Sequence, residues 1–222
     1  MVVEIFENVF NDDVRHLCLK IRNETQPYSN DSGIYQYAIG SKPVRNYLKP
    51  ILKEILAPLG VKLGKHGSIR QMFRPYGIHI DGRTAELDIN IIYKRIVLIP
   101  LEINPTDGDA YTIFFDQMDL SDDITSGHRT YAASNTKSDD PKRISDYSKL
   151  EDIRDKPFDR EIYERYLNHI KYEHLAGLSI HRIVKWKFGD VVCFEPTRLH
   201  ATASFKTNNT LNKTHIIYKA FE

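Results

Sequence analysis

The sequence predicts a mainly β fold of the α+β kind: an antiparallel double-sheet barrel, or jelly roll, with helices packed outside it. Three observations support this fold class. Helical patterns gather near the N-terminus, short β-branched or aromatic runs dominate from about residue 65, and Gly, Pro, Asn and Asp separate those runs. Helices followed by eight or more short strands are typical of such a barrel.

Composition bounds the rest of the architecture. The chain has 222 residues, 41% hydrophobic and 27% charged, which suits a soluble protein with one large core. We expect a single domain over 1–222, with helical support and the first strands in 1–64 and the jelly-roll core in 65–222. The net charge is +1 and the basic residues are scattered, so neither nucleic acid nor a membrane surface is an expected partner.

Two amphipathic helices are expected first. Asn11 stands where it can cap a helix whose apolar residues recur at i, i+3, i+4 and i+7 from Val14. Pro43 opens the second helix, Pro50 should kink it, and Pro58 helps to end it. Both helices need an apolar surface to cover.

Strands are expected to supply that surface. The runs lie at 68–74, 77–81, 87–93, 96–103, 111–115, 178–186, 190–195, 199–205 and 213–221. A turn is predicted at 104–109, where Pro105 presets φ and Gly108 tolerates positive φ. Such alternation of strands and turns favours antiparallel pairing.

A long polar insert interrupts the strands. From about 119 to 157 the chain is nearly free of aliphatic residues, and a loop of this length predicts a lid or a disordered segment. After it, Asp159 can cap a helix whose apolar face extends to Ile170, and Gly177 follows.

His79, Asp81 and His200 are candidate metal ligands. In a strand, residues i and i+2 share a face, so His79 and Asp81 project together. Two histidines and one carboxylate are the facial triad that holds Fe(II) and leaves coordination positions open. By itself a His-x-Asp tripeptide is a common chance match, Asp81-Gly82 is an ordinary turn dipeptide, and His200 could lie on an exposed edge strand. The surrounding segments therefore decide the interpretation.

Those segments resemble the non-haem Fe(II)- and 2-oxoglutarate-dependent oxygenases, whose core is a cupin-like double-stranded β-helix. The resemblance covers roughly residue 68 to the C-terminus and is carried by 74–81, 96–101, 186–194 and 199–202. In that family a Gly-Asp turn feeds the strand before the distal histidine, as Gly189-Asp190 does here.

The resemblance implies a function and its cofactors. His79, Asp81 and His200 would bind iron and be the catalytic residues, with 2-oxoglutarate and O2 as cosubstrates. The expected reaction is hydroxylation of an unactivated C–H of an unidentified small-molecule or side-chain substrate, with release of succinate and CO2. The insert at about 119–157 would then close over the site.

The family also implies a basic residue that pairs with the distal carboxylate of 2-oxoglutarate. Lys213 is the first candidate, 213 − 200 = 13 positions after His200, on a strand where Lys213, His215 and Ile217 share a face. No arginine follows Arg198, which departs from the commonest family pattern, so the anchor would be Lys206, Lys213 or Lys219, or would come from another strand. A jumonji-type arrangement would use Lys94 or Arg95 instead. Since lysine is a point charge, a neighbouring hydroxyl should help to fix the carboxylate.

Some residues outside the candidate triad are expected to support it, and others to be structural. Thr202 and Ser204 share the His200 face and are expected to help orient the ligand imidazoles. The other histidines have no partner at ligand spacing and are expected to be structural or exposed, with His128 in the polar insert the one candidate for a substrate contact. Cys18 and Cys193 lie in apolar stretches and are expected to act as small hydrophobes rather than nucleophiles.

Two other functions are compatible with the sequence. One is a cupin-type metal enzyme that does not use 2-oxoglutarate, and the other is a non-catalytic ligand-binding module. The N-terminus has no basic or long apolar run, and no later stretch has the length of a membrane span. A cytoplasmic protein is therefore expected, while its oligomeric state is left open.

Overall fold

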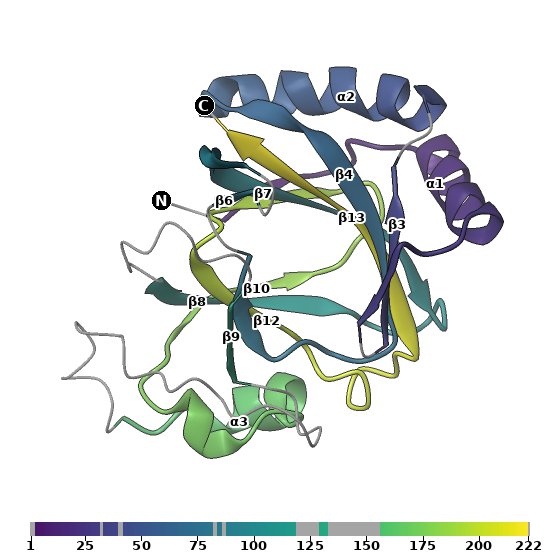
Figure 1. Ribbon diagram of the computed structural model, residues 1–222. Helices are drawn as coiled ribbons and strands as arrows, with labels where there is room; N and C mark the ends of the chain where they lie inside the picture. The colour runs from purple at the N-terminus through teal and green to yellow at the C-terminus, as the bar shows by residue number, and fades with distance from the viewer. Residues whose placement is uncertain are drawn as a thin grey trace.

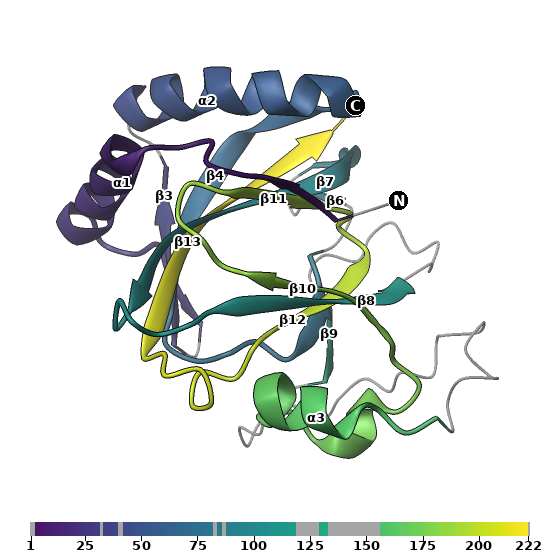
Figure 2. The same cartoon turned by 180° about the vertical axis from the view of Figure 1, so that it is seen from behind.

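Two antiparallel sheets form the body of the protein (Figures 1 and 2). The computed structural model describes residues 3–31, 33–39, 42–81, 84–85, 88–118, 129–132 and 156–221. In these residues the larger sheet has the order β1-β11-β7-β13-β4-β3-β2, with β6 paired to β7, and the smaller sheet has the order β10-β8-β12-β5-β9. The strands are β1 Glu4–Phe6, β2 Ser29–Asp31, β3 Ile34–Ala38, β4 Lys62–Met72, β5 Ile78–Ile80, β6 Thr84–Ala85, β7 Asp88–Asn104, β8 Tyr111–Met118, β9 Arg129–Ala132, β10 Ile180–Lys185, β11 Val191–Phe194, β12 Arg198–Thr202 and β13 Asn212–Phe221.

The chain crosses repeatedly between the two sheets. From β4 in the larger sheet it passes to β5 in the smaller, back to β7, on to β8 and β10, and then through β11, β12 and β13, which alternate between the sheets. This winding is the double-stranded β-helix, and it confirms the predicted jelly roll. The proposed lid at about 119–157 lies outside the described residues, except for β9 and residues 156–157. The single-domain assignment stays a prediction.

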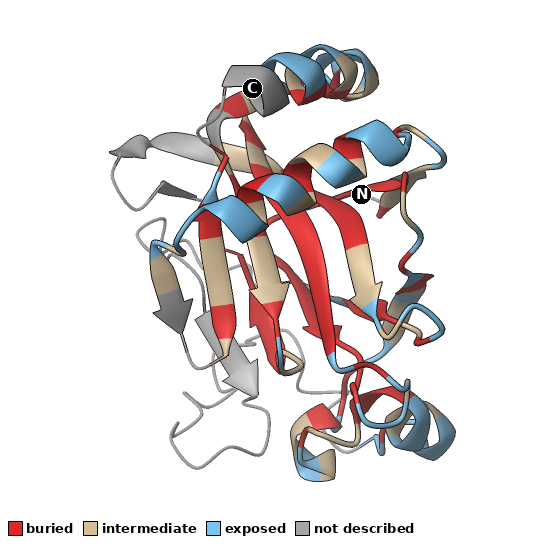
Figure 3. Ribbon diagram, turned by 90° about the vertical axis from the view of Figure 1, so that its right-hand side faces the viewer, coloured by how far each residue is buried: buried red, intermediate tan, exposed pale blue. Residues whose placement is uncertain are grey.

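The two N-terminal helices cover the outer face of the larger sheet (Figures 1 and 3). They are α1 (Asp12–Glu24) and α2 (Lys42–Leu56), the latter followed by a 3-10 turn, Ala57–Leu59. The Asn11 side chain makes no capping hydrogen bond, although Asn11 occupies the N-cap position. Helix α2 contains Pro50 and continues beyond it to Leu56. No described helix has the length and apolarity to span a bilayer.

Strand β7 is buried on both faces. Val97 and Ile99 pack in the core beneath α1 and α2, whereas Ile96 and Leu98 belong to the core between the sheets. A strand covered on both faces has a continuous apolar sequence instead of an alternating one. The two strands predicted at 87–93 and 96–103 form one continuous strand, β7. Strand β13 pairs with β7 from Asn104 to Tyr93.

The outer face of the smaller sheet is covered by the segment after the insert. The predicted helix is α-helical only over α3 (Arg160–Ile162) and continues as a π-helix, Tyr163–Leu167, before a 3-10 turn at Tyr172–Leu175. Asp159 caps it as expected, accepting a hydrogen bond from the Ile162 amide at 2.9 Å. Tyr166 and Leu167 in the π-helix are buried against the smaller sheet.

Two glycines act differently in their turns. The turn predicted at 104–109 is present between β7 and β8, and Gly108 does not have a positive φ in it. Glycine is needed there because a Cβ would lie 2.3 Å from the Asn209 carbonyl oxygen. Gly189 does have a positive φ of 90°. Its carbonyl accepts hydrogen bonds from the amides of Val9 and Phe10, so this turn also anchors the N-terminal segment.

Candidate metal centre

His79 and His200 lie directly opposite each other on neighbouring strands of the smaller sheet. Strands β5 and β12 pair antiparallel, with His200 in register with His79. Ile78 and Ile80 pack outward with Leu199, beneath the π-helix. Alternation along β5 therefore sends His79, and Asp81 just after the strand, to the inner face. The structure thus brings together residues separated by 200 − 81 = 119 positions.

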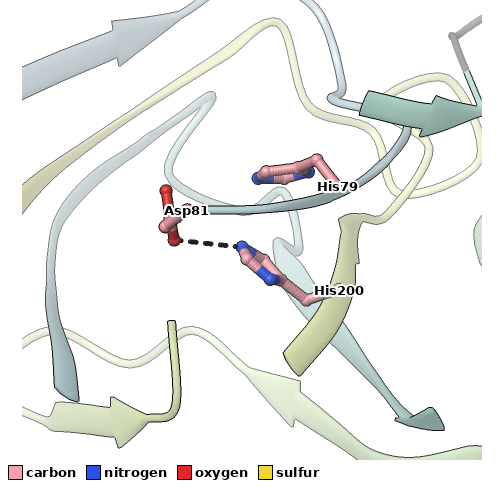
Figure 4. Close-up of side chains that lie close together, drawn as sticks. All are labelled: His79, Asp81 and His200. Carbon is pink, nitrogen blue, oxygen red and sulfur yellow. Dashed lines mark ion pairs between the residues drawn. The ribbon is translucent and has the colours of Figure 1, made fainter. Parts of the chain in front are cut away.

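The three side chains converge on one point (Figure 4). One ligand atom from each of His79, Asp81 and His200 can be chosen so that all three lie within 4.8 Å of one another. His200 Nε2 is 3.4 Å from Asp81 Oδ2, and the two imidazole centroids are 4.1 Å apart. All three residues are 5% exposed. This compact N,N,O set can be bridged by a single ion.

Backbone carbonyls orient both imidazoles. His79 Nδ1 is 2.8 Å from the Gly77 oxygen, and His200 Nδ1 is 2.9 Å from the Arg198 oxygen. A carbonyl oxygen only accepts, so each Nδ1–H donates and each Nε2 keeps its lone pair free for a metal. Carbonyls fill the supporting role that was expected of Thr202 and Ser204.

The charge of Asp81 is favoured despite its burial. Burial alone would raise the pKa of this carboxyl, but the nearby His200, His79 and Arg70 side chains favour its ionised form and bring the pKa well below its usual range. One carboxylate beside two imidazoles is the donor set that suits a divalent transition metal such as Fe(II). The residues present therefore fit that ion.

The triad lines a cavity between the two sheets. Besides the triad, it is lined by Arg70, Met72, Tyr76, Leu98, Thr112, Trp186, Thr202, Lys213, His215 and Ile217. The residues Lys213, His215 and Ile217 come from alternate positions of β13, which confirms their expected common face. Strands of both sheets thus contribute to one site.

Lys213 is the buried cation of this cavity. It is 1% exposed, and its Nζ lies 3.5 Å from the centroid of the Trp186 ring. Among the described residues no carboxylate pairs with it, and burial brings the pKa of this amine well below its usual value. Trp186 Nε1 donates to Thr112 Oγ1 at 2.8 Å, so the Thr112 hydroxyl proton is free to point elsewhere. Thr112 is a hydroxyl of the kind expected near Lys213.

The alternative basic residues stand apart from the cavity. Neither Lys94 nor Arg95 is among its lining residues. Arg95 instead donates to the Lys94 carbonyl at 2.8 Å. Lys206 is exposed, and Lys219 Nζ lies 3.5 Å from the Asp81 backbone oxygen rather than in the cavity.

Sequence reasoning missed several polar lining residues, including His215 and Arg70. His215 was expected to be structural or exposed, yet it is buried in the cavity, and its Nδ1 has no hydrogen-bond partner in the described structure. The i+2 spacing of His215 from Lys213 is the sequence feature that could have indicated its place in the cavity. Arg70 had no local signal, because its place depends on the pairing of β4 with β13, where it stands opposite His215. His128 lies outside the described residues.

The two cysteines are buried, as expected. Burial raises the pKa of Cys18 and of Cys193 to about 12. Both side chains belong to the core between the helices and the larger sheet, away from the His200 face. Neither thiol is therefore activated as a nucleophile.

A buried ion pair supports the strand that carries His200. Arg198 Nε is 3.1 Å from Glu195 Oε2, Arg198 Nη1 donates to the Phe115 carbonyl at 3.0 Å, and both charged side chains are about 5% exposed. The variant Arg198→Met leaves the Glu195 charge buried and unpaired, so we expect a loss of about 3–5 kcal/mol in unfolding free energy. Urea unfolding measures it. The exposed Arg160→Met serves as control, and a loss as small as the control's would contradict the role assigned to the pair.

His169 should make stability depend on pH. Its Nε2 is 3.3 Å from the Tyr76 carbonyl, and burial lowers the pKa of His169 to about 4. The unfolded chain, with a pKa near 6.5, then binds more protons than the folded chain as pH falls from about 6.5 to 4. We expect this fall in pH to lower the free energy of unfolding by about 1–3 kcal/mol, and by less in the His169→Gln variant. Parallel urea titrations at several pH values measure it, and equal pH slopes would refute it.

Comparisons with known proteins place the fold. No family model matches the sequence, and no curated protein matches it. The structure is similar to that of the epimerase SnoN in complex with Fe3+, α-ketoglutarate and nogalamycin RO, with a TM-score of 0.53 and 11% identity over 98% of this chain and 78% of that chain. It is also similar to HygX from Streptomyces hygroscopicus with nickel and 2-oxoglutarate bound, with a TM-score of 0.50 and 14% identity over 99% and 82%.

A third similar structure is the viral collagen prolyl hydroxylase of Paramecium Bursaria Chlorella virus-1 in its 2-oxoglutarate complex. The TM-score is 0.51 and the identity 10%, over 99% of this chain and 96% of that chain. At such low identity the likeness establishes the fold, which is the double-stranded β-helix also found in the 2-oxoglutarate and Fe(II) oxygenases. The function of the chain depends on the chemistry of its own site.

Proposed function

We propose that this protein is an Fe(II)- and 2-oxoglutarate-dependent oxygenase that hydroxylates an unactivated C–H of its substrate. One observation carries the proposal: a two-histidine, one-carboxylate triad lines the same cavity as a buried lysine that pairs with no carboxylate of the described residues. The triad suits Fe(II), and the lysine suits the far carboxylate of a dicarboxylic acid chelated at the metal. The fold, shared with structures that contain 2-oxoglutarate, supports the same reading.

Each part of the cavity has a role in this proposal. His79, Asp81 and His200 hold the metal, which when bound supplies the oxidation of 2-oxoglutarate by O2 to succinate and CO2 and of the substrate C–H to an alcohol. Lys213 holds the 5-carboxylate of the cosubstrate, and the Thr112 hydroxyl donates to it. The apolar walls formed by Leu98 and Ile217 exclude water from the reacting groups.

Glutarate offers a matched control for cosubstrate binding. It keeps both carboxylates of 2-oxoglutarate but lacks the keto oxygen that completes the chelate. Calorimetric titration should show that Mn(II)-loaded protein binds 2-oxoglutarate much more tightly than glutarate, and that metal-free protein does not distinguish them. Equal affinities with metal present would contradict chelation at the triad and favour a metal enzyme that does not use 2-oxoglutarate.

Turnover tests the oxygenase class itself. With Fe(II), 2-oxoglutarate and O2, the protein should release succinate above the level given by the Asp81→Ala variant, and suitable substrates should raise this rate. Succinate release that equals the variant's under all substrates tested would contradict the proposal.

A further inference from the structure

Arg70 is a cation of the cavity that the proposed chemistry does not use. It lies on β4 opposite His215, with its side chain 20% exposed, and it lines the cavity beside the triad. Its Nε is buried without a hydrogen-bond partner in the described structure. Its closest recorded anion is Asp81, with 4.0 Å between Nη1 and Oδ1. That distance is too long for a hydrogen bond.

The positive charges of the cavity outnumber its negative charges. Among its described lining residues, Arg70 and Lys213 are cationic and Asp81 alone is anionic. A divalent metal and the dianion of 2-oxoglutarate add no net charge, so one positive charge is left over. Because Asp81 serves the metal and arginine does not deprotonate in proteins, the surplus charge lies on Arg70. A partly buried guanidinium whose Nε has no hydrogen-bond partner in the described structure favours an anion beside it.

We propose that Arg70 binds a carboxylate of the substrate, so that the substrate is a small aliphatic carboxylic acid. This inference rests on the proposed function. A single surplus charge matches a carboxylate monoanion, and the planar guanidinium fork matches its geometry. Met72, Leu98 and Ile217 supply apolar contact for the attached hydrocarbon. The same cavity must also hold the cosubstrate, which favours a small substrate.

Propionate and its neutral isostere propionamide test this subsite. The protein is loaded with Zn(II) and 2-oxoglutarate, whose uptake is first measured by calorimetry, and binding of each probe is followed by saturation-transfer NMR. We expect propionate to bind and propionamide not to bind. Arg70→Met should weaken propionate binding about 10- to 100-fold while Zn(II) and 2-oxoglutarate still bind, Arg70→Lys should lose less, and the exposed Arg160→Met should lose nothing.

The outcomes separate the subsite from the proposed function. If the protein takes up neither Zn(II) nor 2-oxoglutarate, the proposed function fails and this inference fails with it. If loading is normal but propionate does not bind, or binds equally to Arg70→Met, the subsite alone is wrong. If Arg70→Met instead weakens Zn(II) or 2-oxoglutarate, Arg70 supports Asp81 or the cosubstrate, and the substrate assignment is overturned.

Discussion

The Asp81→Ala variant is expected to lose high-affinity binding of Fe(II). Asp81 is the only anionic ligand of the candidate triad, and its carboxylate lies 3.4 Å from His200 Nε2 in a buried site. Its loss should weaken metal binding by more than the roughly 10- to 100-fold that follows loss of a ligand's supporting partner. Anaerobic calorimetry with Fe(II), or with Mn(II) as a redox-stable substitute, measures the change.

A matched substitution separates the triad from general effects of charge. Asp116 pairs with His181 and is about half exposed, with 3.1 Å between the carboxylate and the imidazole. Asp116→Ala removes the same group from β8 and should leave metal affinity unchanged. His79→Ala and His200→Ala should behave like Asp81→Ala, with folding checked by circular dichroism. Wild-type affinity in all three triad variants would show that the triad is not the metal site.

The Lys213→Met variant is expected to lose 2-oxoglutarate while keeping the metal. Methionine replaces the ammonium group with a side chain of similar length, so the far carboxylate of the cosubstrate would be buried without a partner. Loss of one member of a buried charge pair costs about 2–5 kcal/mol, which is roughly 30- to several-thousand-fold in Kd. Calorimetry on Mn(II)-loaded protein measures both affinities.

Two controls sharpen this prediction. Lys185→Met removes an exposed lysine, which pairs with Asp109 at 2.7 Å on the surface, and should leave 2-oxoglutarate binding unchanged. Lys94→Met tests the jumonji-type alternative directly. If Lys94→Met lost the cosubstrate and Lys213→Met kept it, the assignment of Lys213 would be wrong.

Local patterns predicted that His79 and Asp81 share a face, whereas His200 was added to the candidate triad through the family resemblance. The i, i+2 spacing of His79 and Asp81 holds because residues 78–80 form a strand whose other face is apolar. The shared face of Lys213 and His215 follows from the same periodicity in β13. These features depend only on neighbours in sequence, so the sequence contained them.

Features that depend on non-local pairing were missed. β1 has three residues and exists because it pairs with β11, some 190 positions later. Arg70 enters the cavity through the register of β4 with β13. The break predicted at Lys94 is absent because β13 pairs across it. In each case the partner strand, rather than the local sequence, decides the structure.

The most direct test is an anaerobic titration of metal-free protein with Fe(II) and then 2-oxoglutarate, followed by visible absorption. Chelation of the cosubstrate at the iron should produce a weak metal-to-ligand charge-transfer band, absent in Asp81→Ala and weakened in Lys213→Met. Iron binding without the band would contradict the use of 2-oxoglutarate and favour a cupin-type metal enzyme. No iron binding at all would contradict the metal centre and leave a ligand-binding module.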